Sequence, residues 1–403
     1  MHRLRIAIIA PPWLKMPTEG YGGIEAVLQS LIPELLKLDV DVEVFGVGRR
    51  ALYGAKVHAV TKSDQFQHIL KPMYDFALPI PTAHMLNALH LIAEDGKFDI
   101  IHDHNYFIGP AMLAYAAGRD GLPPAVHTLH GPPLTTDRMA AEGWPDNRIF
   151  WRALAGDHDC YIAPISDAMS RSLPRELRAS GNVLDTVHNA VELADFPFVD
   201  RADKKNYFIT LARFSEEKGQ HIAAKLAAKR GFRLRMAGTV ATIGSKRKLL
   251  IEVANPISRY RTDRDFRYYT DRVLPYILKN PRISYAGNVS GHHKMKFISE
   301  AKALLFPITW EEPFGMSVVE ALACGTPVVA MNHGAMPEII EHGVTGFLAN
   351  SEAEFEAYMR RVDEIDPVVC RQSVAERFSA ELMAERYVAR YRTAIELAKA
   401  KRR

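Results

Sequence analysis

Two cationic side chains follow a short apolar run in the second half of the chain. Arg213 and Lys218 come just after Tyr207–Leu211, which predicts a strand, at the point where a helix is expected to begin. A guanidinium, an ammonium and a helix N-terminus all favour phosphate oxygens. The pattern therefore predicts an anion site. The alternative is an exposed pair with Glu216 or Glu217, which would contribute only about 0–1 kcal/mol.

Two glutamates stand in a Glu-Pro-Phe-Gly-x4-Glu segment further along. Glu312 is expected in a loop after a strand that ends near Ile308, and Glu320 about two turns into a helix that stops at Gly325. A helical segment would separate the two carboxylates by about 12 Å. Because paired glycosidase carboxylates lie roughly 5–9.5 Å apart, two-carboxylate hydrolysis is disfavoured. Contact with two parts of one long ligand is favoured instead.

Two adjacent glycines, Gly22 and Gly23, stand between the first expected strand and the first expected helix, within Glu19–Glu25. Glycine allows the backbone to approach a ligand closely, and the N–H groups of a helix N-terminus favour an anion. An ordinary turn is the alternative. The spacing is not Gly-x-Gly-x-x-Gly, so a nicotinamide cofactor is not indicated.

Apolar runs alternate with helical patterns along the whole chain, which predicts parallel sheets of the doubly wound kind. Strands are expected at Leu4–Ala10, Val42–Val47, Asp99–His102, Ala125–Leu129 and Cys160–Ile165, and again at Tyr207–Leu211, Phe232–Ala237, Ile283–Ala286, Ala303–Pro307 and Thr326–Met331. Between the two series, Glu192–Asp203 is expected to be a linker, and a last helix is expected over Ser379–Leu397. Ligands of such sheets bind beyond the carboxyl ends of the strands, where the charged residues above are placed.

The composition agrees with two folded domains in a chain of 403 residues, of which 48% are hydrophobic. Three cysteines without CxxC spacing exclude a disulfide scaffold and a thiolate zinc site. They favour a reducing compartment, so a cytoplasmic location is predicted. No apolar run reaches about 18 residues, and no transmembrane helix is therefore expected.

Positive charge is concentrated in residues 201–300, which hold 22 Lys and Arg against 8 Asp and Glu. The surplus indicates either an anion site or a solvated cationic face. Nucleic acid is a less favoured partner, because no nucleic-acid-binding signature accompanies the charge. The Arg- and Tyr-rich segment 258–272 is interpreted as an insertion with a solvated face, with a cationic lip for an anionic acceptor as the alternative. Peripheral membrane contact is a further option, although no clear amphipathic anchor supports it.

Two histidines near a strand end are candidate metal ligands. His102 and His104 are two residues apart at a strand end and are expected to point to opposite faces, with one of them packed. Asp103 lies between them, but no third ligand is near, so we predict no metal site. No cofactor is predicted either. Ser166 is expected to cap a helix rather than to belong to a catalytic triad.

The arrangement Glu-Pro-Phe-Gly-x4-Glu-Ala-x-Ala-Cys-Gly-x-Pro-Val-Val of residues 312–329 resembles retaining glycosyltransferases of family 4, the glycogen synthase-like group with the GT-B fold. Other family features follow in the expected order over nearly the whole chain: the Gly-Gly loop, Asp99-Ile-Ile-His102-x-His104, His130-Gly131, Arg213-x4-Lys218 and the closing helix. Two departures are the hinge Asn189-Ala190-Val191-Glu192, where the family often has Asn-Gly-Val-Asp, and the long segment 242–272.

The resemblance implies two Rossmann-like domains with a cleft between them: an acceptor domain over 1–195, a nucleotide-sugar domain over 196–378, and a helix over 379–403 that crosses back to the first domain. It implies the following site: Arg213 and Lys218 on the diphosphate, Glu312 on sugar hydroxyls, the backbone of Phe314, Gly315 and Met316 on sugar and phosphate, Glu320 on the ribose, Asn288 and Val289 on the base, Gly22 and Gly23 on the distal phosphate, and His130 beside sugar and acceptor.

The implied activity is metal-independent transfer of a sugar from a nucleotide diphosphate sugar to a hydroxyl acceptor, with retention of configuration. The acceptor could be a glycan, a lipid-linked intermediate or a small molecule. Two other functions are kept open: a nucleotide-sugar epimerase of similar fold, and a non-catalytic protein that binds nucleotide sugars. The sequence predicts no oligomeric state.

Overall fold

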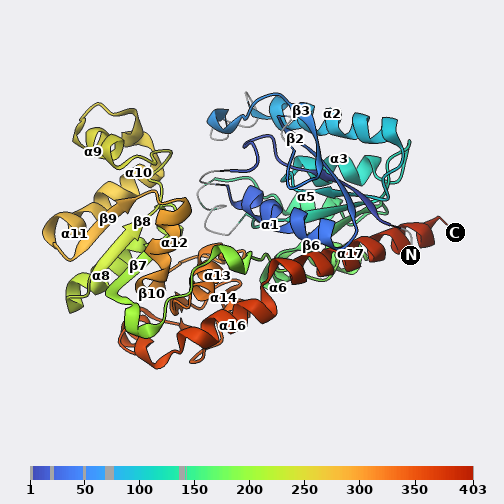
Figure 1. Cartoon of the computed structure of the whole chain (residues 1–403). Coiled ribbons are helices and arrows are strands. Elements are labelled where there is room, and N and C mark those ends of the chain that lie inside the picture. Colours follow the sequence, from blue (N-terminus) through green and yellow to red (C-terminus); the bar gives the residue numbers. More distant parts are fainter. Residues whose placement is uncertain are drawn as a thin grey trace. The chain divides into compact units, whose positions relative to one another are not determined.

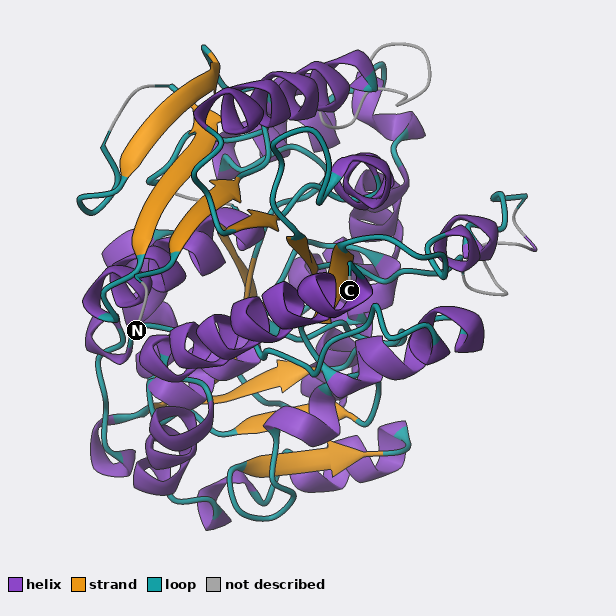
Figure 2. Cartoon of the chain, turned by 90° about the vertical axis from the view of Figure 1, so that its right-hand side faces the viewer, coloured by secondary structure: helices purple, strands orange, loops and turns teal. Residues whose placement is uncertain are grey.

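The computed structural model describes residues 3–18, 22–48, 51–68, 77–135, 141 and 143–402. The chain forms two compact units (Figure 1). Unit 1 comprises Met1–Ala190 and Ala380–Arg403, and unit 2 comprises Val191–Ser379. Each unit is a parallel sheet flanked by helices (Figure 2).

Unit 1 holds a six-stranded sheet in the order β3-β2-β1-β4-β5-β6. Its strands are β1 Arg5–Ile9, β2 Asp41–Val47, β3 Lys56–Thr61, β4 Ile100–Asp103, β5 Ala125–Leu129 and β6 Cys160–Pro164. Its helices are α1 Gly23–Lys37, α2 Pro79–Asp95, α3 Ile108–Ala116, α5 Arg148–Ala153, α6 Asp167–Ser172, α7 Arg175–Ala179 and α17 Ala380–Lys401, with a short turn η1 Phe66–His68.

Unit 2 holds a second six-stranded sheet in the order β12-β11-β10-β7-β8-β9. Its strands are β7 Lys205–Leu211, β8 Leu234–Ala237, β9 Ile283–Gly287, β10 Ala301–Phe306, β11 Val328–Met331 and β12 Gly346–Ala349. Its main helices are α8 Gln220–Arg230, α9 Lys246–Ala254, α10 Arg264–Tyr268, α11 Leu274–Lys279, α12 Gly291–Ser299, α13 Met316–Ala323, α14 Met336–Ile339, α15 Glu352–Tyr358 and α16 Pro367–Arg377. Short 3-10 turns lie at η3 Leu193–Asp195, η4 Arg201–Asp203, η5 Glu216–Lys218, η6 Arg259–Thr262 and η8 Val362–Glu364, and η7 Tyr269–Val273 is a π-helical segment between α10 and α11.

The apolar pattern explains these elements. Strands buried on both faces read as continuous apolar runs, and β5 is buried at every position from Ala125 to Leu129. The helix predicted after the first strand is confirmed as α1, which buries Val27, Leu28, Leu31, Ile32 and Leu35 at helical spacing. The ten predicted strands are present. The edge strands β3 and β12 were missed, because β3 is only partly buried and β12 is four residues long.

The last helix, α17, packs in unit 1. Tyr387 and Tyr391 are fully buried, and their hydroxyls lie 2.8 Å from Thr128 Oγ1 and 2.7 Å from His102 Nδ1. These bonds join the end of the chain to β4 and β5. The chain enters and leaves unit 2 at one place, where Val191 and Ser379 form an isolated parallel bridge.

The Arg- and Tyr-rich segment folds as a small lobe of unit 2, seen in yellow around α9 and α10 (Figure 1). Its aromatic side chains point inward, since Tyr260, Phe266, Tyr268 and Tyr269 are all buried. Most of its arginines are exposed. The periodicity of the segment therefore reflects packing of tyrosines under a cationic outer face.

Candidate functional site

The predicted anion site lies at the carboxyl edge of the unit 2 sheet. β7 and β10 are neighbours in this sheet, so the loops that follow them meet. Lys218 Nζ donates to Glu312 Oε2 at 2.6 Å across 94 residues of sequence, and Trp310 Nε1 donates to the same oxygen at 2.9 Å. Thr309 N also donates to Glu217 O at 2.9 Å, which ties the two loops together.

A glycine permits this approach of the two loops. Gly219 follows Lys218 with a φ of +65°, and a Cβ at that position would lie 1.8 Å from Pro307 O. Only a residue without a side chain can turn there against the end of β10. The position of Lys218 thus depends on backbone packing between two strands that are distant in sequence.

Arg213 lies in the same loop and is held by two carboxylates. Its Nη2 donates to Glu217 Oε1 at 3.0 Å, and its Nη1 donates to Asp265 Oδ2. The pairing with Glu217 is the one that the sequence offered as the alternative. Asp265 was missed, because it comes from α10 in the inserted lobe. Burial raises the pKa of Asp265, while Arg213 opposes that shift. An anion that binds Arg213 would displace one or both of these carboxylates from the guanidinium.

The second predicted carboxylate, Glu320, is buried on α13. It accepts from Lys294 Nζ at 2.6 Å. Lys294 stands on α12 and was also missed, since no local motif marks it. Each of the two glutamates is therefore neutralised by a lysine from another element.

The Phe-Gly-Met segment forms the start of α13, and the first backbone N–H groups of a helix have no partner within the helix. Gly315 has a φ of +96° and precedes the helix, whose first residue is Met316. Phe314 is buried and packs edge-on against Phe378, with ring centroids 5.9 Å apart. The backbone N–H groups at this helix N-terminus face the carboxyl side of the sheet, where they favour an anion.

The loop between β11 and α14 contacts the backbone of Glu312. Gly334 has a φ of +59°, and its N–H donates to Glu311 Oε2 at 2.6 Å. Ala335 N donates to Glu312 O at 2.9 Å. A Cβ on Gly334 would lie 2.2 Å from Glu312 O. Sequence reasoning did not find Gly334, because its role comes from a contact with another loop.

The predicted base-binding residues follow β9. Asn288 is exposed and Val289 is half-buried. Asn288 N donates to Gly244 O at 3.4 Å, so this strand end lies beside the loop that leads into α9.

The remaining predicted residues lie in unit 1. Gly22 precedes α1, and its carbonyl accepts from Ala26 N at 2.9 Å, while Gly23 is exposed. Glu19, Gly20 and Tyr21 of the same motif lie outside the described residues. Glu25 is buried in the first turn of α1, where burial raises its pKa. This carboxyl group next to the Gly-Gly loop was not predicted.

His130 follows β5 and pairs with another histidine. Its Nε2 lies 2.8 Å from His104 Nδ1. The expectation that His102 and His104 point to opposite faces is wrong: both are buried, with ring centroids 4.1 Å apart. Alternate residues of an extended chain share a face. Burial lowers the pKa of His130 to about 3, so the pair is neutral and one ring donates to the other.

The neighbouring buried pair is Asp103 and His127, whose Oδ2 and Nδ1 lie 2.6 Å apart. Gly109 packs directly on Asp103, since a Cβ there would lie 1.8 Å from Asp103 Oδ2. Within the described ranges, no three His, Cys, Asp or Glu side chains are grouped so as to hold a metal ion. Ser166 caps α6 by accepting from Met169 N, as predicted.

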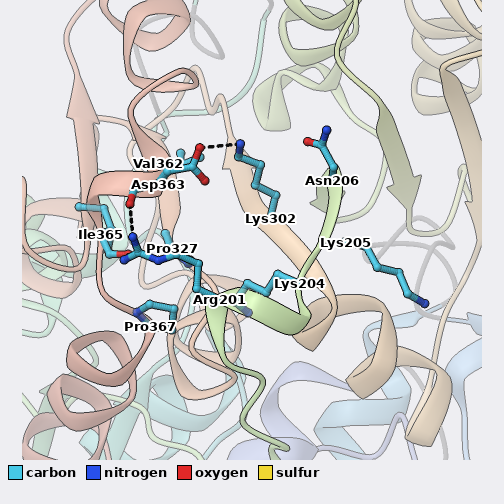
Figure 3. A pocket seen from close by; sticks show the side chains of 10 residues that line it. All are labelled: Arg201, Lys204, Lys205, Asn206, Lys302, Pro327, Val362, Asp363, Ile365 and Pro367. Atoms are coloured by element: carbon cyan, nitrogen blue, oxygen red, sulfur yellow. Dashed lines mark hydrogen bonds and ion pairs between the residues drawn. The ribbon is translucent and has the colours of Figure 1, made fainter.

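A cavity of about 170 Å³ also lies in unit 2, lined by Arg201, Lys204, Lys205, Asn206, Lys302, Pro327, Val362, Asp363, Ile365 and Pro367 (Figure 3). It lies at the amino ends of β7 and β10, opposite to Lys218. Lys204 Nζ donates to Ser299 O and Thr326 Oγ1, both at 2.9 Å. Burial lowers its pKa to about 8. These bonds hold the base of the sheet together.

Two family models match the chain in succession. The model for glycosyltransferase family 4 matches residues 21–195, and the model for glycosyl transferases group 1 matches residues 193–366. The chain belongs to the family 4 glycosyltransferases. The resemblance inferred from residues 312–329 is thereby confirmed, and the enzyme class is glycosyltransferase.

Sequence relatives of this glycosyltransferase include enzymes that are named for different activities. D-inositol 3-phosphate glycosyltransferase of Mycobacterium sp. strain KMS is 25% identical over 372 residues, which cover 86% of this chain and 79% of that one. Glycogen synthase of Mycobacterium tuberculosis is 25% identical over 259 residues, which cover 62% of this chain and only 55% of that enzyme. A 41.2 kDa protein of the Klebsiella pneumoniae cps region is 25% identical over 320 residues, covering 74% of this chain and 79% of that protein.

Solved structures share the fold. Sucrose-phosphate synthase from Thermosynechococcus elongatus has a TM-score of 0.73 at 19% identity, covering 98% of this chain and 100% of that one. Anabaena HepE in complex with UDP and glucose has a TM-score of 0.65 at 16% identity, covering 97% of this chain and 100% of that one. The fold of this glycosyltransferase is GT-B, as predicted. Across the described part of the chain, no helix has the length and apolar character needed to span a membrane.

The buried histidines make the stability of unit 1 depend on pH. Burial lowers the pKa of His84 to about 4 from an ordinary value of 6.5, and it lowers the pKa of His102 and His104 well below that value. Below pH 6.5 these imidazoles bind protons in the unfolded chain but stay neutral in the folded unit. Stability should therefore fall as the pH drops from about 6.5 toward 4, by about 1.4 kcal/mol per pH unit for each group.

Urea denaturation at pH 7 and pH 5 tests this expectation. His84→Gln should reduce the loss of stability between the two pH values, because it removes one of the buried imidazoles whose pKa is lowered. His292→Gln is the matched control, since it removes an exposed imidazole at the start of α12 in unit 2. Equal stability of the wild-type protein at both pH values would contradict the buried neutral state.

Proposed function

We propose that this glycosyltransferase moves a sugar from a nucleotide diphosphate sugar to a hydroxyl acceptor, with retention of the anomeric configuration. The observation that carries the proposal is the contact of Lys218 with Glu312, beside Arg213, at the carboxyl edge of the unit 2 sheet. A diphosphate needs the two cations, and the sugar attached to it needs a hydrogen-bond acceptor next to them. This edge supplies both.

In the proposed donor complex, each predicted residue has one task. Arg213 and Lys218 bind diphosphate oxygens, Glu312 binds sugar hydroxyls, the backbone of Phe314, Gly315 and Met316 supports sugar and phosphate, Glu320 binds the ribose, Asn288 and Val289 bind the base, Gly22 and Gly23 approach the distal phosphate, and His130 lies by sugar and acceptor. A structural neighbour supports a sugar-nucleotide donor, because HepE, which shares the fold, was crystallised with UDP and glucose and with UDP-glucose.

Glu312 suits hydroxyl binding better than nucleophilic attack. Lys218 and Trp310 both donate to Oε2, so the lone pairs of this oxygen are already engaged. Oε1 is then the atom that we expect a sugar hydroxyl to reach. We therefore infer no covalent intermediate on Glu312. The acceptor attacks from the face that the diphosphate leaves, as the family resemblance implies, and the departing phosphate assists removal of the acceptor proton.

The main catalytic task is stabilisation of the leaving group. Negative charge develops on the diphosphate as the anomeric bond breaks, and preorganised donors at that point stabilise it. Arg213 and Lys218 are held in place before the donor arrives, because each is already paired with carboxylates. Since the two side chains supply positive charge themselves, we propose that transfer does not need a divalent metal ion.

A thermal-shift screen of nucleotide diphosphate sugars tests donor binding. A donor at about 100 times its dissociation constant should add about 2.7 kcal/mol of stability, and the correct sugar and base should give the largest shift. A screen in which no nucleotide diphosphate sugar shifts the transition would overturn the proposal.

Product analysis then separates the possible activities. Incubation with the donor and a panel of hydroxyl acceptors should yield a glycoside whose anomeric configuration matches that of the donor. Isomerised sugar from the donor alone would instead show an epimerase. Binding without turnover of any acceptor in the panel would count against catalysis and in favour of a binding protein.

A further inference from the structure

Three apolar side chains on α9 and in the loop after it are exposed. The exposed fractions of Leu250, Ile251 and Ile257 are 62%, 58% and 89%. Single exposed apolar residues are normal on protein surfaces, but several on one short element indicate a contact surface. Helix α9 is attached to unit 2 through Leu249, which is buried. The side chains on either side of Leu249 in the helix therefore have no part in the core.

Helix geometry gathers these side chains on one face. At about 100° per residue, Arg247 and Ile251 stand one above the other opposite Leu249, and Leu250 lies beside them. The loop after the helix is fixed as well. Arg261 donates to the carbonyls of Asn255 and Val253 at 3.0 and 3.1 Å, which closes the loop that carries Ile257 onto the end of α9.

The charge around this face is positive. Residues 245–264 contain six Lys and Arg (246, 247, 248, 259, 261 and 264) against two acids, Glu252 and Asp263. Lys246 and Arg247 are exposed at the start of α9. Glu252 Oε2 accepts from Ser258 Oγ at 2.6 Å, and Asp263 Oδ1 accepts from two backbone N–H groups of α10. The six cations exceed the two acids by four, although Arg264 is paired with Glu216.

The cationic and apolar side chains of α9 are complementary to a surface with negative charge at its boundary and apolar groups beneath. We propose that Lys246, Arg247, Leu250, Ile251 and Ile257, here called the α9 patch, dock the protein onto an anionic lipid surface. The three apolar side chains enter the boundary of the acyl region, and the two cations contact lipid phosphates. Because the patch is small, the attachment is reversible and weakens with salt. The proposal does not depend on the proposed function.

Flotation of the full-length protein with vesicles tests the patch. The wild type should float with phosphatidylcholine vesicles that contain phosphatidylglycerol, but not with phosphatidylcholine alone, and high salt should release it. The triple variant Leu250→Ser, Ile251→Ser and Ile257→Ser should reduce the bound fraction by about tenfold. Lys246→Gln combined with Arg247→Gln should reduce it to a similar extent.

Val368→Ser is the matched control. Val368 is also an exposed apolar residue of unit 2, on α16, with an exposed fraction of 43%. This variant should float like the wild type. Equal flotation of the triple variant and the wild type would overturn the proposal, and so would a failure of the wild type to float with anionic vesicles. A wild type that instead forms dimers through these residues would assign the patch to a second copy of the chain.

A labelled cysteine gives a readout that misfolding cannot imitate. All three native cysteines are buried, so a thiol-reactive environment-sensitive dye should label Ile257→Cys selectively. Its emission should shift to the blue with anionic vesicles, and the dye on Val368→Cys should not respond. An unchanged spectrum at Cys-substituted Ile257 in vesicles that capture the protein would contradict insertion of the patch. Donor binding measured by thermal shift should be unaffected by the triple variant and by both Val368 variants.

Discussion

Replacing Arg213 and Lys218 together by alanine should reduce glycosyl transfer by at least about 10³-fold, since loss of one preorganised donor to a developing oxyanion typically costs about 10²–10³ in rate. The two side chains supply the positive charge that meets the leaving diphosphate. Lys218 is the more buried of the two, with 16% of its side chain exposed against 45% for Arg213. The measurement is kcat/KM for the donor identified by thermal shift.

The fold should survive this double change. Removal of Arg213, which is 45% exposed, opens Glu217 and Asp265 to water, and Trp310 still donates to Glu312 after the loss of Lys218. Lys229→Ala combined with Arg360→Ala is the matched control, because it also removes two cations, both from Glu356, and should leave kcat/KM unchanged. Near-normal turnover by a folded Arg213 and Lys218 double variant would rule out their assignment to the diphosphate.

Gly334→Ala should impair transfer strongly even though Gly334 carries no functional group. The new Cβ would lie 2.2 Å from the carbonyl oxygen and 2.3 Å from the nitrogen of Glu312. Both are backbone atoms and cannot rotate away, so the loop that positions Glu312 must move. A displacement on the order of 1 Å can cost about 10²-fold in rate. We expect a fall of that size in kcat/KM.

Gly343→Ala separates backbone strain from displacement of the site. Gly343 also has a positive φ, +80°, but a Cβ there would meet nothing within 4 Å. It should lose roughly 1–2 kcal/mol of stability for the left-handed backbone and keep its activity. If the two alanine variants were equally active, the contact between Gly334 and Glu312 would have no part in positioning the site.

Much of the fold could be predicted from local pattern. Strands such as β5 and β6 are buried on both faces and therefore appear as apolar runs in the sequence, and α1 has its stripe at helical spacing. The inserted lobe could not be interpreted in the same way. Its tyrosines and arginines alternate over short helices, and only packing shows that Tyr260 and Tyr269 are inside. The relation of His102 to His104 was predicted wrongly, because adjacent residues of a strand point to opposite faces and residues two apart share a face.

The amino-acid sequence by itself determined the family, the order of the elements and the residue types at the strand ends, because these depend on neighbours close along the chain. Only the tertiary structure decided which charges meet. Lys218 contacts Glu312, and Arg213 contacts Asp265, because the sheet places β10 beside β7 and the inserted lobe against the loop after β7. Such pairings join residues far apart in sequence, and no local periodicity specifies them.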